Sequence, residues 1–151
     1  MYQNYQKEDR YELTYISKKT GEVKKCFPRS KEKKEEQLTV CKEQGIKVVS
    51  CKKLYPFNMM KNQHNFELIS NICFCRMHDM EIGEIQFDGT EYDKMYDMKE
   101  KADRFFCWLQ GPIAWLTWED WKDAKELSEM AIIHRQNACI EAGRPDLVTY
   151  C

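Results

Sequence analysis

The sequence lacks any apolar run that approaches the roughly 20 residues a membrane-spanning helix needs. Its first residues, MYQNYQKEDRYEL, also lack the apolar segment of a secretory signal peptide. Neither an internal repeat nor a low-complexity tract is present. These absences predict a cytoplasmic protein that does not associate with membranes.

Recognisable catalytic and cofactor motifs are missing as well. The chain has no phosphate-binding or dinucleotide-binding glycine motif, no HExxH zinc motif, no EF-hand and no paired CxxC. Cys75 and His78 stand three residues apart on one predicted helix face, and His64 lies too far along that helix to share a metal with His78. We therefore predict no catalytic residue, no metal and no cofactor. An enzyme with a dispersed site remains the third functional interpretation.

Eight cysteines are scattered along the chain. Disulfide frameworks belong mainly to short exported chains, and no export signal is present here. Free cysteine behaves as a small apolar residue that is usually buried. Most of the eight are therefore predicted to be reduced and buried.

The composition is that of a folded chain, with 42% apolar and 13% aromatic residues among 151. This length suits a single domain with a substantial core. We expect residues 1–151 to form one domain that unfolds in one cooperative transition. It would contain a mixed unit at about 10–57 and a helical part at about 58–143.

The first half follows the order strand, strand, helix, strand (ββαβ). Tyr11–Ile16 and Glu22–Phe27 are rich in strand-forming residues and are separated by the turn sequence SKKTG. Ser30 is a suitable N-cap for a helix that ends near Gln44, before Gly45. Ile46–Cys51 would form a third strand. A helical crossover then predicts a three-stranded antiparallel sheet in the order 2-1-3, with the first strand central.

Three helices are predicted in the second half, forming a bundle. The first runs from Asn58 to about His78 and is apolar on more than one side, which favours a central position. Thr90 is expected to cap a second helix that ends near Leu109. Thr117, with Asp120 three residues later, is expected to cap a third that ends near Ala142. The predicted fold class is therefore α+β. An aromatic cluster spans the break between the last two helices and is interpreted mainly as core: Phe105, Phe106, Trp108, Trp115, Trp118 and Trp121.

Charge is unevenly distributed along the chain, although the net charge is only −1. Residues 1–62 hold 15 Lys and Arg against 8 Asp and Glu, whereas residues 63–151 hold 9 against 17. Such asymmetry points to charged partners.

Carboxylates line one face of each of the last two predicted helices. Their spacing of about 5–6 Å along a helix face roughly resembles the phosphate repeat of a nucleic-acid strand. A protein with such faces could occupy a basic nucleic-acid channel in place of its ligand. The predicted partner-binding residues are Asp93, Asp97, Glu100, Glu119, Asp120, Asp123 and Glu126. The alternative is an ordinary solvated helix face, since lysines are interspersed.

A basic cluster supports a different function, direct nucleic-acid binding. Phosphate contacts need clustered cations, and these crowd the second predicted strand and the start of the first helix. They are Lys24, Lys25, Arg29, Lys31, Lys33 and Lys34. Glu32, Glu35 and Glu36 interrupt the cluster, and an ordinary basic surface is the simpler explanation.

In size and style the chain resembles the small accessory proteins of bacterial phages and conjugative elements. Segments that carry the resemblance are Thr20-Gly21-Glu22, Lys52-Lys53-Leu54-Tyr55-Pro56-Phe57-Asn58 and Trp118-Glu119-Asp120-Trp121. Anti-CRISPR proteins are one class within that group. The resemblance implies a small non-enzymatic protein that binds and inhibits a host nucleic-acid-processing enzyme, or its ribonucleoprotein. The acidic faces are the surface through which we expect that contact. A nucleic-acid-binding accessory or regulatory protein is the alternative function.

Overall fold

A computed structural model describes residues 9–107 and 112–151, which belong to two compact units. The sheet unit contains residues 9–57 and 115–121, and the helical unit contains residues 58–107, 112–114 and 122–151. The chain therefore passes between the units three times. Unfolding in one transition stays a prediction.

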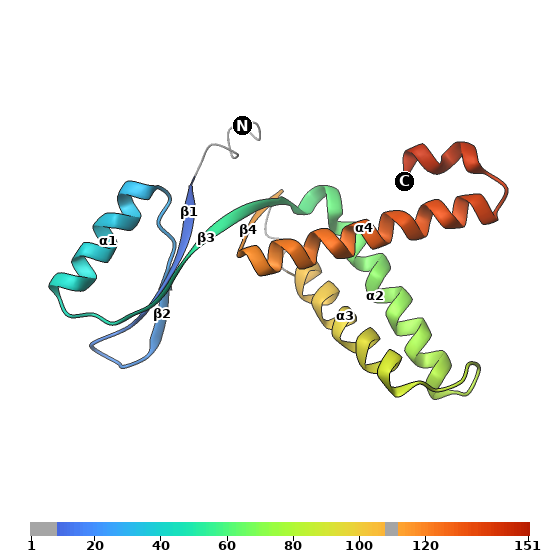
Figure 1. Cartoon of the computed structure of the whole chain (residues 1–151), viewed down its shortest axis with the longest axis horizontal. Coiled ribbons are helices and arrows are strands. Elements are labelled where there is room, and N and C mark those ends of the chain that lie inside the picture. The colour runs from blue at the N-terminus through green and yellow to red at the C-terminus, as the bar shows by residue number, and fades with distance from the viewer. Residues whose placement is uncertain (1–8, 108–111) are drawn as a thin grey trace. The chain divides into compact units, whose positions relative to one another are not determined.

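Four strands form one antiparallel sheet in the order β2-β1-β3-β4 (Figure 1). Their bounds are β1 (Arg10–Ile16), β2 (Val23–Cys26), β3 (Val48–Asn58) and β4 (Ile113–Leu116). Strand β1 is antiparallel to both neighbours, and its Leu13 pairs with Cys26 on one side and with Cys51 on the other. This confirms the predicted 2-1-3 order of the first three strands. The prediction of only three strands is wrong, because β4 extends the sheet beyond β3.

Helix α1 (Lys31–Glu43) forms where the local capping signals place it. The Ser30 hydroxyl accepts a hydrogen bond from the Lys33 backbone N–H at 3.1 Å. Gly45 adopts φ +66°, a left-handed conformation that favours glycine and reverses the chain after the helix. Of the α1 residues, only Cys41 is buried, so the helix contacts the sheet through a narrow face.

Helices α2 (Met59–Glu81) and α3 (Gly89–Cys107) lie side by side as an antiparallel pair in the helical unit (Figure 1). Phe66 and Phe105 are completely buried between them, with ring centroids 5.4 Å apart. Phe74 is 57% exposed, and Leu68 and Ile72 are half-buried. The apolar residues on more than one side of α2 are therefore not all buried, and its outer side faces solvent.

Helix α4 (Trp118–Glu141) enters the helical unit at Lys122 and crosses the α2–α3 pair obliquely (Figure 1). Arg135 of α4 donates a hydrogen bond to the Asn65 side chain of α2. The three predicted helices are thus present, but the predicted three-helix bundle is not matched exactly. Capping by Thr117 is confirmed, because its hydroxyl accepts from the Asp120 N–H at 3.4 Å. A 3₁₀ helix, Pro145–Tyr150, follows α4.

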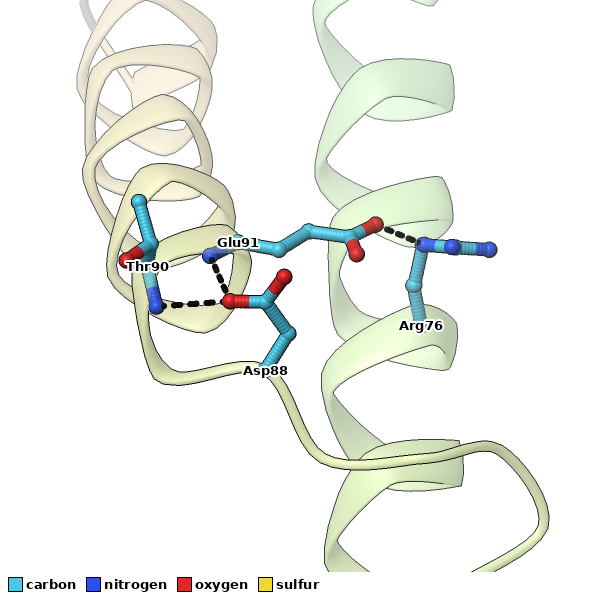
Figure 2. Close-up of polar contacts among 4 residues, drawn as sticks. All are labelled: Arg76, Asp88, Thr90 and Glu91. Atoms are coloured by element: carbon cyan, nitrogen blue, oxygen red, sulfur yellow. Dashed lines mark hydrogen bonds and ion pairs between the residues drawn. The ribbon is translucent and has the colours of Figure 1, made fainter.

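The N-cap of α3 is Asp88, and the prediction of Thr90 is wrong. Figure 2 shows the Asp88 carboxylate accepting hydrogen bonds from the backbone N–H groups of Thr90 and Glu91, at 3.0 and 3.2 Å. The Glu91 carboxylate then accepts a hydrogen bond from Arg76, which links the start of α3 to α2. The predicted end near Leu109 lies outside the described residues.

This cap gives a direct test. Asp88→Ala is expected to lower the free energy of unfolding by about 1 kcal/mol, because two helix-start N–H groups lose their acceptor. Urea denaturation monitored by circular dichroism measures the change. The matched control is Thr90→Ala, an exposed position expected to change stability by less than about 0.5 kcal/mol. A larger loss in the control than in Asp88→Ala would contradict the assignment.

Candidate functional site

A groove between α3 and α4 brings three of the predicted acidic residues together. Asp97 of α3 and Asp123 and Glu126 of α4 line it, with Lys94 and Lys101. The Lys101 ammonium lies 3.3 Å from the Asp97 carboxylate and 3.8 Å from that of Asp123. The groove is therefore acidic overall and partly neutralised at its centre.

The other predicted acidic residues are placed differently. Asp93 and Glu100 are exposed on α3, outside the lining of this groove. Glu119 and Asp120 belong to the sheet unit, although they share a helix with Asp123. Five of the seven predicted residues are consequently in the helical unit.

Asp103 is an acidic residue of α3 that the sequence interpretation missed. It accepts hydrogen bonds from the Ser70 hydroxyl of α2 and from the Lys99 ammonium at 2.6 Å. Partial burial by itself raises the pKa of Asp103, but these hydrogen bonds outweigh it and lower the pKa below the usual value. The i, i+4 spacing of Lys99 and Asp103 was the available signal in the sequence. Its role is to join α2 to α3.

The predicted basic cluster is only partly available to a ligand. The Lys25 ammonium lies 3.3 Å from the Glu12 carboxylate, and the Lys34 ammonium lies 3.2 Å from Glu35 and 4.7 Å from the centre of the Tyr11 ring. The hydrogen bond with Glu35 raises the pKa of Lys34. The remaining members, Lys24, Arg29, Lys31 and Lys33, are exposed. Glu32, Glu35 and Glu36 line the same α1 surface as Lys31.

The two units differ in the sign of their charge, although less sharply than residues 1–62 and 63–151 do. The sheet unit carries 13 Lys and Arg against 9 Asp and Glu, a balance of +4. The helical unit carries 10 against 15, a balance of −5. Each unit therefore has its own sign of charge.

The aromatic cluster predicted around the last helical break is divided between the units. Phe105 is buried in the helical unit, whereas Trp115, Trp118 and Trp121 belong to the sheet unit. The guanidinium of Arg10 lies 4.5 Å from the centre of the Trp115 ring. Trp118 stacks on Trp121 with centroids 5.4 Å apart and is 47% exposed. Trp108 lies outside the described residues.

The cysteines are less buried than predicted. Only Cys41 and Cys73 are buried, whereas Cys51, Cys75 and Cys107 are exposed and Cys26, Cys139 and Cys151 are half-buried. His78 stacks against Phe74, with ring centroids 6.1 Å apart. Within residues 9–107 and 112–151, no three His, Cys, Asp or Glu side chains converge as a metal ion would require.

No protein-family model, curated protein or solved structure matches the chain. In the described part of the chain, none of the helices combines the length and apolar composition that crossing a membrane requires. The surfaces of the two units are therefore the features from which a function can be inferred.

Proposed function

We propose that the chain is a small non-catalytic protein of a mobile genetic element that inhibits a host nucleic-acid-processing enzyme, such as a CRISPR effector. Its acidic helical unit would bind the basic surface with which that enzyme holds nucleic acid. The observation that carries the proposal is the charge separation, with −5 on the helical unit and +4 on the sheet unit.

Carboxylates on α3 and α4 supply the contacts in this proposal. Asp93, Asp97 and Glu100 are exposed on α3, and Glu126 is exposed on α4 beside the groove. Such carboxylates match a channel built to hold phosphates, and complementary charge accelerates encounter as well as fixing orientation. The link to mobile elements rests on the resemblance in size and style.

A second candidate function is direct nucleic-acid binding by the sheet unit. The observation that favours it is the exposure of Lys24, Arg29, Lys31 and Lys33 around the end of β2 and the start of α1. Phosphate contacts by these cations would weaken steeply as the salt concentration rises.

Matched charge reversals distinguish the two functions. The acidic variant carries Asp93→Lys, Glu100→Lys and Glu126→Lys, and the basic variant carries Lys24→Glu, Lys31→Glu and Lys33→Glu. All six residues are exposed, so both variants should retain their fold. The acidic variant is expected to associate with a CRISPR effector ribonucleoprotein about tenfold or more slowly at low salt and to inhibit it less. The basic variant should inhibit as the parent does.

Inhibition of cleavage, association rates at two salt concentrations and gel shifts with DNA and RNA provide the measurements. Circular dichroism and thermal unfolding check that both variants are folded. If the acidic variant keeps full activity while the basic variant loses nucleic-acid binding, the second function replaces the first.

A further inference from the structure

Two cysteine thiols meet at the end of the helical unit. The sulfur of Cys139, in the last turns of α4, lies 3.7 Å from the sulfur of Cys151, just after the 3₁₀ helix. Both residues are half-buried, so small reagents can reach them. No other two cysteine sulfurs in the described part of the chain are in hydrogen-bond contact.

Local backbone structure brings the two residues together. Gly143 adopts φ +73°, and the Arg144 N–H donates to the Cys139 carbonyl at 2.8 Å, which reverses the chain after α4. The Arg144 guanidinium then holds the Asp146 carboxylate through two hydrogen bonds, at 3.0 and 3.1 Å. Finally, the Cys151 N–H donates to the Val148 carbonyl at 3.3 Å and its thiol to the Leu147 carbonyl at 3.7 Å.

We propose that Cys139 and Cys151 form a reversible intramolecular disulfide, with a small disulfide such as glutathione disulfide as oxidant. A bond of about 2.05 Å requires the sulfurs to approach further, which rotation about the side-chain bonds permits. The proposal concerns a modification site and does not depend on the proposed function.

The reaction is a two-step thiol–disulfide exchange. The Cys151 thiolate attacks one sulfur of glutathione disulfide, forms a mixed disulfide and releases one glutathione thiolate. The Cys139 sulfur then loses its proton, attacks the Cys151 sulfur and releases the second glutathione. The two protein thiols are oxidised, the glutathione disulfide accepts the two electrons, and the two protons end on two glutathione thiols. The reverse exchange restores both cysteines.

The hydrogen-bond contact with the Cys151 thiol raises the pKa of Cys139. The Cys139 thiol therefore stays protonated at neutral pH and loses its proton only in the second step of the exchange. Exposed Cys75 and Cys107 make no sulfur–sulfur hydrogen bond in the described part of the chain and would stop at the mixed disulfide. The product at the pair therefore differs chemically from the product at the isolated thiols.

Peptide mapping of the full chain after treatment with glutathione disulfide tests the proposal. Trypsin leaves Gln136–Cys151 as one peptide, because Arg144 precedes a proline. This peptide is expected to lose two hydrogens and to resist alkylation, while Cys75 gains a glutathione. A second cleavage before Asp146 places Cys139 and Cys151 on separate fragments. The disulfide should keep these fragments linked until it is reduced.

Two variants serve as controls. In Cys139→Ser, Cys151 should carry one glutathione instead of a disulfide, whereas Cys75→Ser should leave the disulfide unchanged. Circular dichroism checks that each variant is folded. A glutathione adduct on Cys151 of the parent chain, or Cys139 and Cys151 each linked to other chains, would overturn the proposal.

Discussion

Phe66→Ala is expected to lower the free energy of unfolding by about 3–5 kcal/mol, the usual cost of removing a buried phenylalanine ring. The Phe66 side chain is fully buried in α2, and its ring lies 5.4 Å from that of the equally buried Phe105 in α3. The substitution leaves a cavity in the only interface that joins these two helices along their length. Because total stability is commonly about 5–15 kcal/mol, the loss would remove a large share of it.

Phe74→Ala is the matched control, since it removes the same side chain from the same helix. Phe74 is 57% exposed, so its substitution should change stability by only about 0.5 kcal/mol. Urea denaturation followed by circular dichroism measures both variants. Similar losses for the two would contradict the assignment of the core between α2 and α3.

A fragment of residues 1–57 is expected not to form the sheet, although it contains β1, β2, α1 and almost all of β3. It lacks β4, which pairs with β3, and it lacks Trp121, whose indole N–H donates to the Pro56 carbonyl at 3.1 Å. It also loses the contact of Arg10 with Trp115. Chains of about this length are already marginal in the area they bury, so these losses decide the outcome. Amide chemical-shift dispersion in nuclear magnetic resonance spectra provides the measurement.

Restoring the missing segment is the control for this fragment. Residues 1–57 joined by a flexible glycine–serine linker to residues 113–121 should regain dispersed amide signals and a cooperative transition. If the fragment of residues 1–57 already unfolds cooperatively, residues 113–121 are not required for the sheet to fold.

Local signals in the sequence predicted the helix ends best. Ser30, Thr117 and Gly45 each act within a few residues of the backbone groups that they satisfy or the turn that they permit, so sequence alone places them. The same reasoning failed at α3, where Asp88 and Thr90 are both good capping residues two positions apart. Which of the two residues becomes the N-cap depends on the path of the chain from α2 to α3. That path depends in turn on how the two helices pack.

Strand β4 could not be predicted in this way. It has only four residues, too few for a periodic pattern, and it is stabilised by pairing with β3, more than 50 positions earlier in the chain. For the candidate site, helical spacing predicted that Asp93, Asp97 and Glu100 share a face of α3. It could not show that Glu119 and Asp123, one turn apart on α4, belong to different units.

The opposite charges of the two units have a consequence for how the protein behaves during purification. With a net charge of −1 and an isoelectric point near 6.3, the whole chain looks almost neutral at pH 7. An ion-exchange resin interacts with local surfaces, however, so at low ionic strength the sheet unit can bind a cation exchanger and the helical unit an anion exchanger. At high protein concentration the basic unit of one molecule would likewise attract the acidic unit of another, and added salt would disperse the resulting assemblies by screening.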